Sequence, residues 1–156
     1  MAVAVSPIAG SPPLTRPERR LAWWLRSFAI LFAIGAAGFL VRPDDTVREL
    51  DRVGALLRLR TLPPSSAPVA SDFWLALAVA NMAAVAVCAA IAGSDVRRHR
   101  ALVHPIVASK LTSAATGALL FVGWTPAFPF LAIALVDLPI AIILVRALRA
   151  APAMPQ

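Results

Sequence analysis

Four long apolar runs constrain the fold of this chain more than any other feature of its sequence. They lie at about 21–41, 73–93, 101–124 and 126–148, and polar or charged stretches separate the first three. About 20 consecutive, mostly apolar residues are needed for an α-helix to cross the hydrocarbon core of a bilayer. The runs therefore predict an all-α integral membrane protein with four transmembrane helices in a bundle.

The composition supports lipid as the solvent of these helices. Of the 156 residues, 60% are hydrophobic, whereas soluble domains usually contain about 45–50% apolar residues. A soluble fold of this size has too small an interior to bury that much apolar surface. We therefore divide the chain into a flexible Pro-rich tail at 1–20, a transmembrane domain at 21–149 and a C-terminal tail at 150–156.

The polar segment between the first two runs has the pattern of a short amphipathic helix at about 45–60. Apolar residues recur there at helical spacing, and Thr46 and Glu49 have the spacing of an N-terminal capping box. Such a helix either lies in the membrane surface or packs on the ends of the spans. Three prolines, Pro63, Pro64 and Pro68, then predict a linker before the second run.

The arginines predict the orientation of the helices. Cytoplasmic loops of membrane proteins carry an excess of Lys and Arg. With cytoplasmic termini the inner side holds nine arginines, against five in the segment between the first two runs. The inner nine are Arg16, Arg19, Arg20, Arg26, Arg97, Arg98, Arg100, Arg146 and Arg149, and the outer five are Arg42, Arg48, Arg52, Arg58 and Arg60. This count predicts a multi-pass protein of the bacterial inner membrane, with both termini cytoplasmic and anionic lipid headgroups as partners of the inner face.

Tryptophans agree with that orientation. Indole rings favour the headgroup level of a bilayer. We expect Trp23 and Trp24 to anchor the inner interface, and Trp74 and Trp124 to anchor the outer one.

Two ionisable residues, Lys110 and Asp137, lie within the third and fourth runs. They are at nearly equal distances along the chain from the turn near Trp124, so an antiparallel hairpin brings them to the same depth. A charge at the bilayer centre costs about 2.5–3.5 kcal/mol on insertion scales, and such residues usually pair or line a cavity. We expect an ion pair, which is either a structural lock between the two helices or a proton- or ion-responsive site.

Other intramembrane residues predict helix packing. Asn81 in the second run is expected to form an interhelical hydrogen bond, a common use of such side chains in lipid. Ser113 and Thr116 belong to the polar surroundings of Lys110, which make the third run the most polar of the four. Small residues recur every fourth position in the second run, a spacing that lets helix backbones approach closely. This predicted packing ladder comprises Ala76, Ala80, Ala84, Cys88 and Ala92. The alternative interpretation is an alanine-rich composition without structural meaning.

The sequence gives no motif for catalysis or for cofactor binding. The net charge of +7 lacks the aromatic-interleaved basic stripe of a nucleic-acid surface, so we expect no nucleic-acid partner. His99 and His104 are badly placed for haem ligation, and no cluster has the spacing of metal ligands. We expect no metal and no cofactor.

These observations favour a non-catalytic role. The preferred interpretation is an accessory or scaffolding subunit of a membrane complex, in contact with other transmembrane helices of a hetero-complex or a homo-oligomer. The alternative is a small oligomeric transporter or proton-coupled carrier that uses the Lys110 and Asp137 pair. A membrane enzyme acting on lipid or quinone is a third interpretation.

Overall fold

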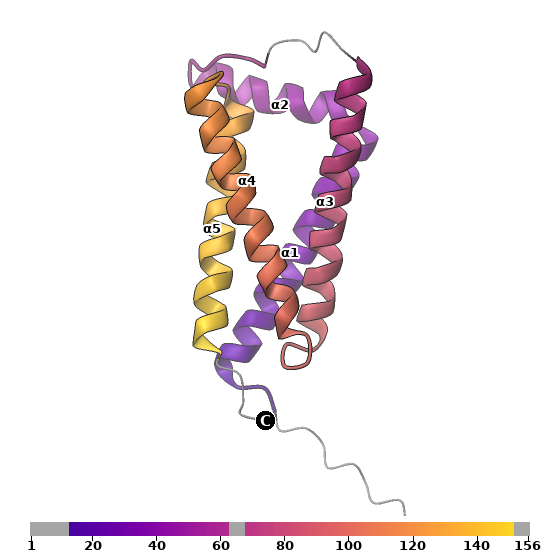
Figure 1. Cartoon of the computed structure of the whole chain (residues 1–156), viewed down its shortest axis with the longest axis vertical. Helices are drawn as coiled ribbons and strands as arrows, with labels where there is room; N and C mark the ends of the chain where they lie inside the picture. The colour runs from indigo at the N-terminus through magenta and orange to yellow at the C-terminus, as the bar shows by residue number, and fades with distance from the viewer. Residues whose placement is uncertain (1–12, 63–67, 152–156) are drawn as a thin grey trace, which may run out of the picture.

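The chain is all-helical over the residues that the computed structural model describes, which are 13–62 and 68–151. Four of the helices are long and apolar enough to cross a membrane, so the expected all-α membrane fold is confirmed. The elements in chain order are α1 (Arg16–Val41), α2 (Pro43–Leu56), α3 (Pro68–Ser94), the short 3-10 helix η1 (Arg100–Leu102), α4 (Val103–Gly123) and α5 (Phe128–Ala150) (Figure 1).

The first helix begins at Arg16, earlier than the predicted start at residue 21, because a capping box fixes its N-terminus. Thr15 Oγ1 accepts a hydrogen bond from the backbone N–H of Glu18, and the Glu18 carboxylate accepts one from the backbone N–H of Thr15. Pro17 lies in the first turn, where a missing N–H costs nothing. Residues 16–20, assigned to the tail from the sequence, are therefore helical.

The other spans differ from their predicted limits by a few residues. α3 begins at Pro68, which was expected in the linker, although its candidate membrane span runs from Asp72 to Ser94. Proline fits the first turn of a helix as well as it fits a linker. The first residues of the predicted third span form η1, and α5 continues to Ala150, which was assigned to the C-terminal tail.

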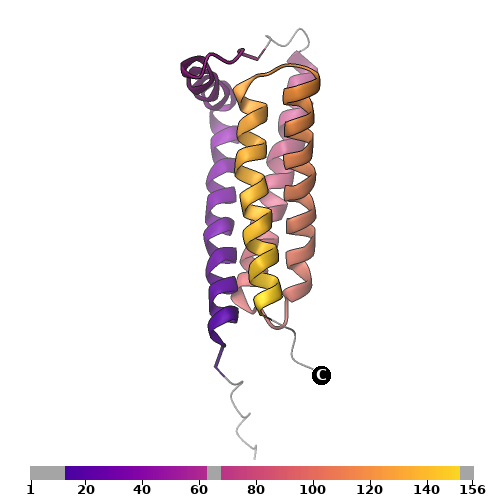
Figure 2. The same ribbon diagram turned by 90° about the vertical axis from the view of Figure 1, so that its left-hand side faces the viewer.

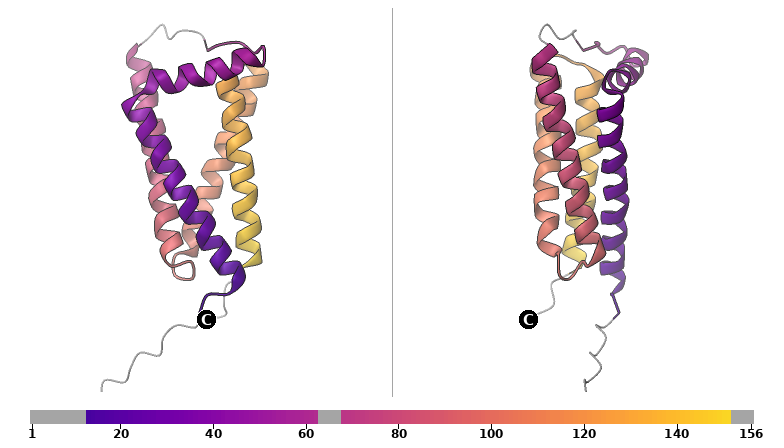
Figure 3. Two further views of the ribbon diagram at one scale, coloured as in Figure 1. Left: turned by 180° about the vertical axis from the view of Figure 1, so that it is seen from behind. Right: turned by 90° about the vertical axis from the view of Figure 1, so that its right-hand side faces the viewer.

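The four long helices form two antiparallel pairs, α1 with α3 and α4 with α5 (Figures 1 and 2). We call the end where α1 begins and α5 finishes the terminal end of the bundle. The pairs approach each other there and separate toward the opposite end, across which α2 runs from one pair to the other (Figure 3).

The hydrophobic core lies toward the terminal end, where all four long helices contribute side chains. Its buried members include Leu21, Leu25, Phe28 and Phe32 of α1, Ala86 and Ala89 of α3, Ile106 of α4, and Ile140 and Leu144 of α5. Many large apolar side chains elsewhere on the helices are exposed, up to 86% for Val122. Such surfaces suit lipid as the surrounding solvent.

α2 starts and ends differently from the predicted helix at 45–60. It begins at Pro43, so Thr46 lies inside its first turn, where its hydroxyl donates to the Arg42 carbonyl instead of capping the helix. The predicted capping box at Thr46 is therefore wrong. A Schellman turn ends the helix: Leu59 N–H donates to the Gly54 carbonyl, and Arg58 takes a left-handed φ of 56°.

α2 packs on the ends of the spans. Gly54 is buried against the start of α5, where an added Cβ would come within 2.7 Å of Phe128 Cβ. The Arg60 backbone N–H donates to the Pro126 carbonyl at 3.2 Å. Packing on the spans, one of the two expected placements, is thus observed, while Leu56 and Leu57 stay 84% and 56% exposed.

Candidate functional site

Lys110 of α4 and Asp137 of α5 form an ion pair inside the bundle. Lys110 Nζ lies 3.1 Å from Asp137 Oδ1 and 3.3 Å from Oδ2, so it donates to both carboxylate oxygens. The two residues are only 4% and 6% exposed. Their similar distance from the turn between α4 and α5 places them at one depth, as the sequence pattern predicts.

A third helix covers this pair. The Phe32 ring of α1 lies with its centroid 4.1 Å from Lys110 Nζ, a cation–π distance. Phe32 itself is 4% exposed, and its ring is tilted by 42° against that of Phe28, with the two centroids 6.4 Å apart. The ion pair and the ring together join α1, α4 and α5. Phe32 was not predicted from the sequence as a site residue. The pattern that could have identified it is its four-residue spacing from Phe28 on one face of α1.

Asn81, Ser113 and Thr116 lie in a separate place, a groove of about 500 Å³ between α3, α4 and α5 that we call the polar groove. Ser109 Oγ donates to Asn81 Oδ1 at 3.3 Å across it. Asn81, Thr112 and Thr116 are exposed at this surface. The lining residues are Asn81, Ala108, Ser109, Thr112, Ser113, Thr116, Gly117, Leu120, Phe130 and Ile133.

The predicted small-residue ladder of α3 is buried at one end only. Ala92 is fully buried, Cys88 is half-buried, and Ala76, Ala80 and Ala84 are exposed. Successive steps of four residues advance about 400° around a helix, so the ladder rotates by about 40° at each step. The three alanines toward the start of α3 are therefore exposed in the described chain, and an interface at them with another chain stays a prediction.

The tryptophans lie toward the ends of the long helices, and their role as interface anchors stays a prediction. Trp23 and Trp24 belong to the start of α1, and Trp74 and Trp124 to the opposite ends of α3 and α4. Trp23, Trp74 and Trp124 are each about 60% exposed or more, whereas Trp24 is partly buried, packs against the hydrophobic core and stacks on Phe28.

Arginines at the terminal end bind the ends of neighbouring helices, a role that charge counting does not predict. Arg26 Nε donates to the Gly93 carbonyl at 2.9 Å, near the end of α3. Arg100 donates to the carbonyls of Leu148 and Ala151 at the end of α5. Cationic donors suit the free carbonyls and the partial negative charge of a helix C-terminus.

Arg97 binds the start of α1 through a two-point contact. Its Nε lies 2.7 Å from Glu18 Oε1 and its Nη2 lies 2.8 Å from Glu18 Oε2. These hydrogen bonds raise the pKa of Arg97. Glu18 is 5% exposed and also caps α1, so the contact ties the loop between α3 and α4 to the first turn of α1.

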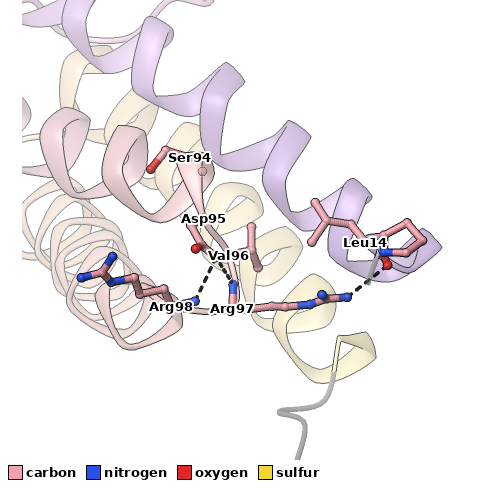
Figure 4. A pocket seen from close by; sticks show the side chains of 8 residues that line it. Leu14, Ser94, Asp95, Val96, Arg97 and Arg98 are labelled. Atoms are coloured by element: carbon pink, nitrogen blue, oxygen red, sulfur yellow. Dashed lines mark hydrogen bonds between the residues drawn. The ribbon is translucent and has the colours of Figure 1, made fainter. Parts of the chain in front are cut away.

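A cleft of about 640 Å³ lies beside this contact, lined by 13–14 and 93–98 (Figure 4). Its polar groups bond to one another and to the adjoining helices. Asp95 Oδ1 accepts from the backbone N–H groups of Arg97 and Arg98 at 3.1 Å each. Ser94 Oγ donates to the Ile91 carbonyl. This arrangement shapes the loop and supplies no reactive group.

No protein-family model, curated protein or solved structure matches the chain. Its function must therefore be argued from the polar groove, the ion pair and the arginines at the terminal end.

Proposed function

We propose that this chain is a non-catalytic accessory or scaffolding subunit of a membrane complex in the bacterial inner membrane, and that the polar groove receives a transmembrane helix of another protein. One observation carries the proposal. Hydroxyl and amide side chains face outward near the middle of membrane-spanning helices, where lipid offers them no hydrogen-bonding partner.

The hydrogen-bonding capacity of the groove exceeds what the chain itself uses. Asn81 accepts one hydrogen bond from Ser109, and its amide nitrogen donates to no acceptor in the described part of the chain. A partner helix with a carbonyl or hydroxyl acceptor at this depth satisfies that donor. Side chains of this kind contribute about 0.6–2 kcal/mol each to helix association in membranes.

The ion pair supports a structural role for the chain's own charges. Lys110 is bonded to both oxygens of Asp137 and covered by Phe32, so the paired charges form a compact neutral unit. Pairing offsets the cost of holding each charge in lipid. In the alternative function, a small oligomeric transporter or proton-coupled carrier, the same buried carboxylate exchanges protons with water.

The proposed orientation has both termini in the cytoplasm. It is supported by the nine-to-five distribution of arginines between the two ends. Anionic headgroups then surround the terminal end of the bundle.

A photo-crosslinking amino acid at Thr116 tests the groove in native membranes. We expect a crosslink to one other membrane protein, identified by mass spectrometry, and expect Asn81→Leu to abolish it. Leu135 is the matched control position: it is 59% exposed and lies about 200° around α5 from the groove residue Ile133. Equal crosslinking from both positions, or none at Thr116, contradicts the proposal. If the only crosslink is to a second copy of the chain, the protein is a homo-oligomer and not an accessory subunit.

Proton flux into proteoliposomes that contain a pH-sensitive dye distinguishes the carrier function from the scaffold function. The scaffold predicts no proton flux above that of empty liposomes. A flux that Asp137→Asn removes supports the carrier instead.

A further inference from the structure

A second groove, which we call the basic groove, lies between α4 and α5 at the terminal end of the bundle. Its volume is about 500 Å³. Its lining residues are Arg100, His104, Val107, Ala108, Leu111, Val145, Leu148 and Arg149. Basic side chains and aliphatic side chains thus share one surface at the terminal end.

The basic and aliphatic residues occupy different depths of the groove. His104, Val107, Ala108 and Leu111 have the i, i+3, i+4, i+7 spacing of one face of α4. Val145, Leu148 and Arg149 have the i, i+3, i+4 spacing of one face of α5, which runs in the opposite direction. The charged residues therefore lie at the end of the bundle, and the aliphatic residues continue from them toward the membrane interior.

The basic side chains of the groove differ in how far their polar atoms are already engaged in hydrogen bonds. Arg100 binds the carbonyl groups at the end of α5, and His104 Nδ1 lies 3.2 Å from the Ala101 carbonyl. Arg149 is exposed and has no hydrogen bond or ion pair with any residue that the structure describes. Its guanidinium is therefore available to a ligand.

Within the described residues no acidic side chain bonds to Arg100, His104 or Arg149. From Val96 to the end of the sequence the only acid is Asp137. It lies 12 residues from Arg149 along α5, which is about 18 Å, and it is paired with Lys110. The mouth of the groove therefore carries net positive charge.

We propose that the basic groove binds one anionic phospholipid, with its phosphate on Arg149 and His104 and an acyl chain along Val107, Leu111 and Val145. A guanidinium binds phosphate through charge-assisted hydrogen bonds. Basic pockets between transmembrane helices are also a recurrent site for anionic headgroups. The aliphatic wall selects a diacyl lipid over a soluble phosphate, because a soluble phosphate leaves that wall uncovered.

Native mass spectrometry of the purified full-length chain, titrated with phosphatidylglycerol or phosphatidylcholine, tests the site. We expect one phosphatidylglycerol to bind preferentially, and expect Arg149→Gln to weaken its affinity about fivefold, the loss typical of one basic residue near an anionic lipid surface. Arg149→Lys should retain most of the affinity. The matched control is Arg146→Gln, which removes an equal charge from an exposed position of α5 outside the groove. Thermal unfolding checks that each variant is folded.

The other results overturn the proposal in different ways. Equal weakening by Arg146→Gln and Arg149→Gln means a diffuse attraction of the basic end for anionic lipid, with no site in the groove. Equal binding of the two lipids removes the role of the headgroup charge. Displacement of phosphatidylglycerol by an excess of inorganic phosphate assigns the groove to free phosphate and not to a lipid.

Discussion

Lys110 Nζ is held 3.1 Å from Asp137 Oδ1, and both residues are buried inside the bundle. The two helices that carry them, α4 and α5, are antiparallel. This contact therefore exists in only one register of α4 against α5. A slip of one residue in either helix separates the charges. The pair therefore specifies the packing of the hairpin, whatever its net contribution to stability.

A double-mutant cycle measures this coupling. We expect Lys110→Met or Asp137→Leu alone to destabilise the folded chain by about 3–5 kcal/mol, because each leaves a buried charge without its partner. The double variant should recover much of that loss, since two apolar side chains carry no desolvation penalty in lipid. Unfolding of the four proteins in mixed micelles gives the coupling energy.

Additivity is the result that contradicts the pair. If the two single losses sum to that of the double variant, the residues do not interact. The register of α4 and α5 then depends on the packing of their other side chains.

The same hairpin depends on a glycine. A Cβ at Gly117 would lie 2.7 Å from the Phe130 carbonyl oxygen, a backbone atom that cannot move without shifting α5. We expect Gly117→Ala to lower stability by about 1–3 kcal/mol, the usual cost of overpacking. Gly38→Ala is the control, because an added Cβ there meets no atom within 4 Å.

In that control the change should be neutral or stabilising by about 0.5–1 kcal/mol, the helix-propensity advantage of alanine over glycine. Thermal unfolding of the two variants side by side makes the comparison. Similar stability of both would mean that α4 and α5 do not approach closely at Gly117.

The positions of the spans were predictable from the sequence because hydropathy is a local property, and so was the depth shared by Lys110 and Asp137. The helix ends were less predictable. Thr15 to Glu18 and Thr46 to Glu49 have the same capping-box spacing, yet only the first caps a helix. Pro43 already begins α2, so Thr46 falls inside it.

The contact of Phe32 with Lys110 could not be predicted from the sequence pattern, for another reason. It joins α1 to a hairpin more than 70 residues later in the chain, and the packing of one helical pair on another depends on side-chain shape. The arginines at the terminal end show the same limit: counting charges predicts orientation but not which carbonyl each guanidinium binds.

The exposed alanines of α3 provide a test of assembly. Ala80→Leu or Ala84→Leu should leave the folded monomer intact, because both positions are exposed. If another helix packs there, the larger side chain should weaken the assembly by separating the backbones. Size-exclusion chromatography with light scattering, in detergent, compares the assemblies.

Ala89→Leu is the matched change on the buried face of the same helix. Ala89 is 0% exposed, so we expect this variant to destabilise the monomer itself by about 1–3 kcal/mol through overpacking. If assembly is unchanged in both Ala80→Leu and Ala84→Leu, the four-residue spacing of small residues in α3 reflects only an alanine-rich composition.

The contact between Arg97 and Glu18 predicts unequal effects of two adjacent arginines. Arg97→Gln removes both hydrogen bonds to the buried Glu18 carboxylate, so the melting temperature should fall. Arg98 is exposed, and only its backbone N–H is bonded to Asp95. The Arg98→Gln variant should therefore have a melting temperature close to that of the unchanged protein. Equal melting of the two variants would show that the contact adds nothing to stability.

The last prediction concerns the orientation of the bundle. Asp44 in the first turn of α2 and Arg98 in the loop between α3 and η1 are both exposed, and they lie at opposite ends of the spans. The excess of arginine at the terminal end predicts that this end is cytoplasmic. In a chain with Cys88→Ser, which removes the single natural cysteine, Asp44→Cys should react with a membrane-impermeant maleimide in intact spheroplasts. Arg98→Cys should react only after the membrane is permeabilised. The reverse labelling pattern would show that the bundle has the opposite orientation. The terminal end would then not contact the anionic headgroups of the cytoplasmic leaflet.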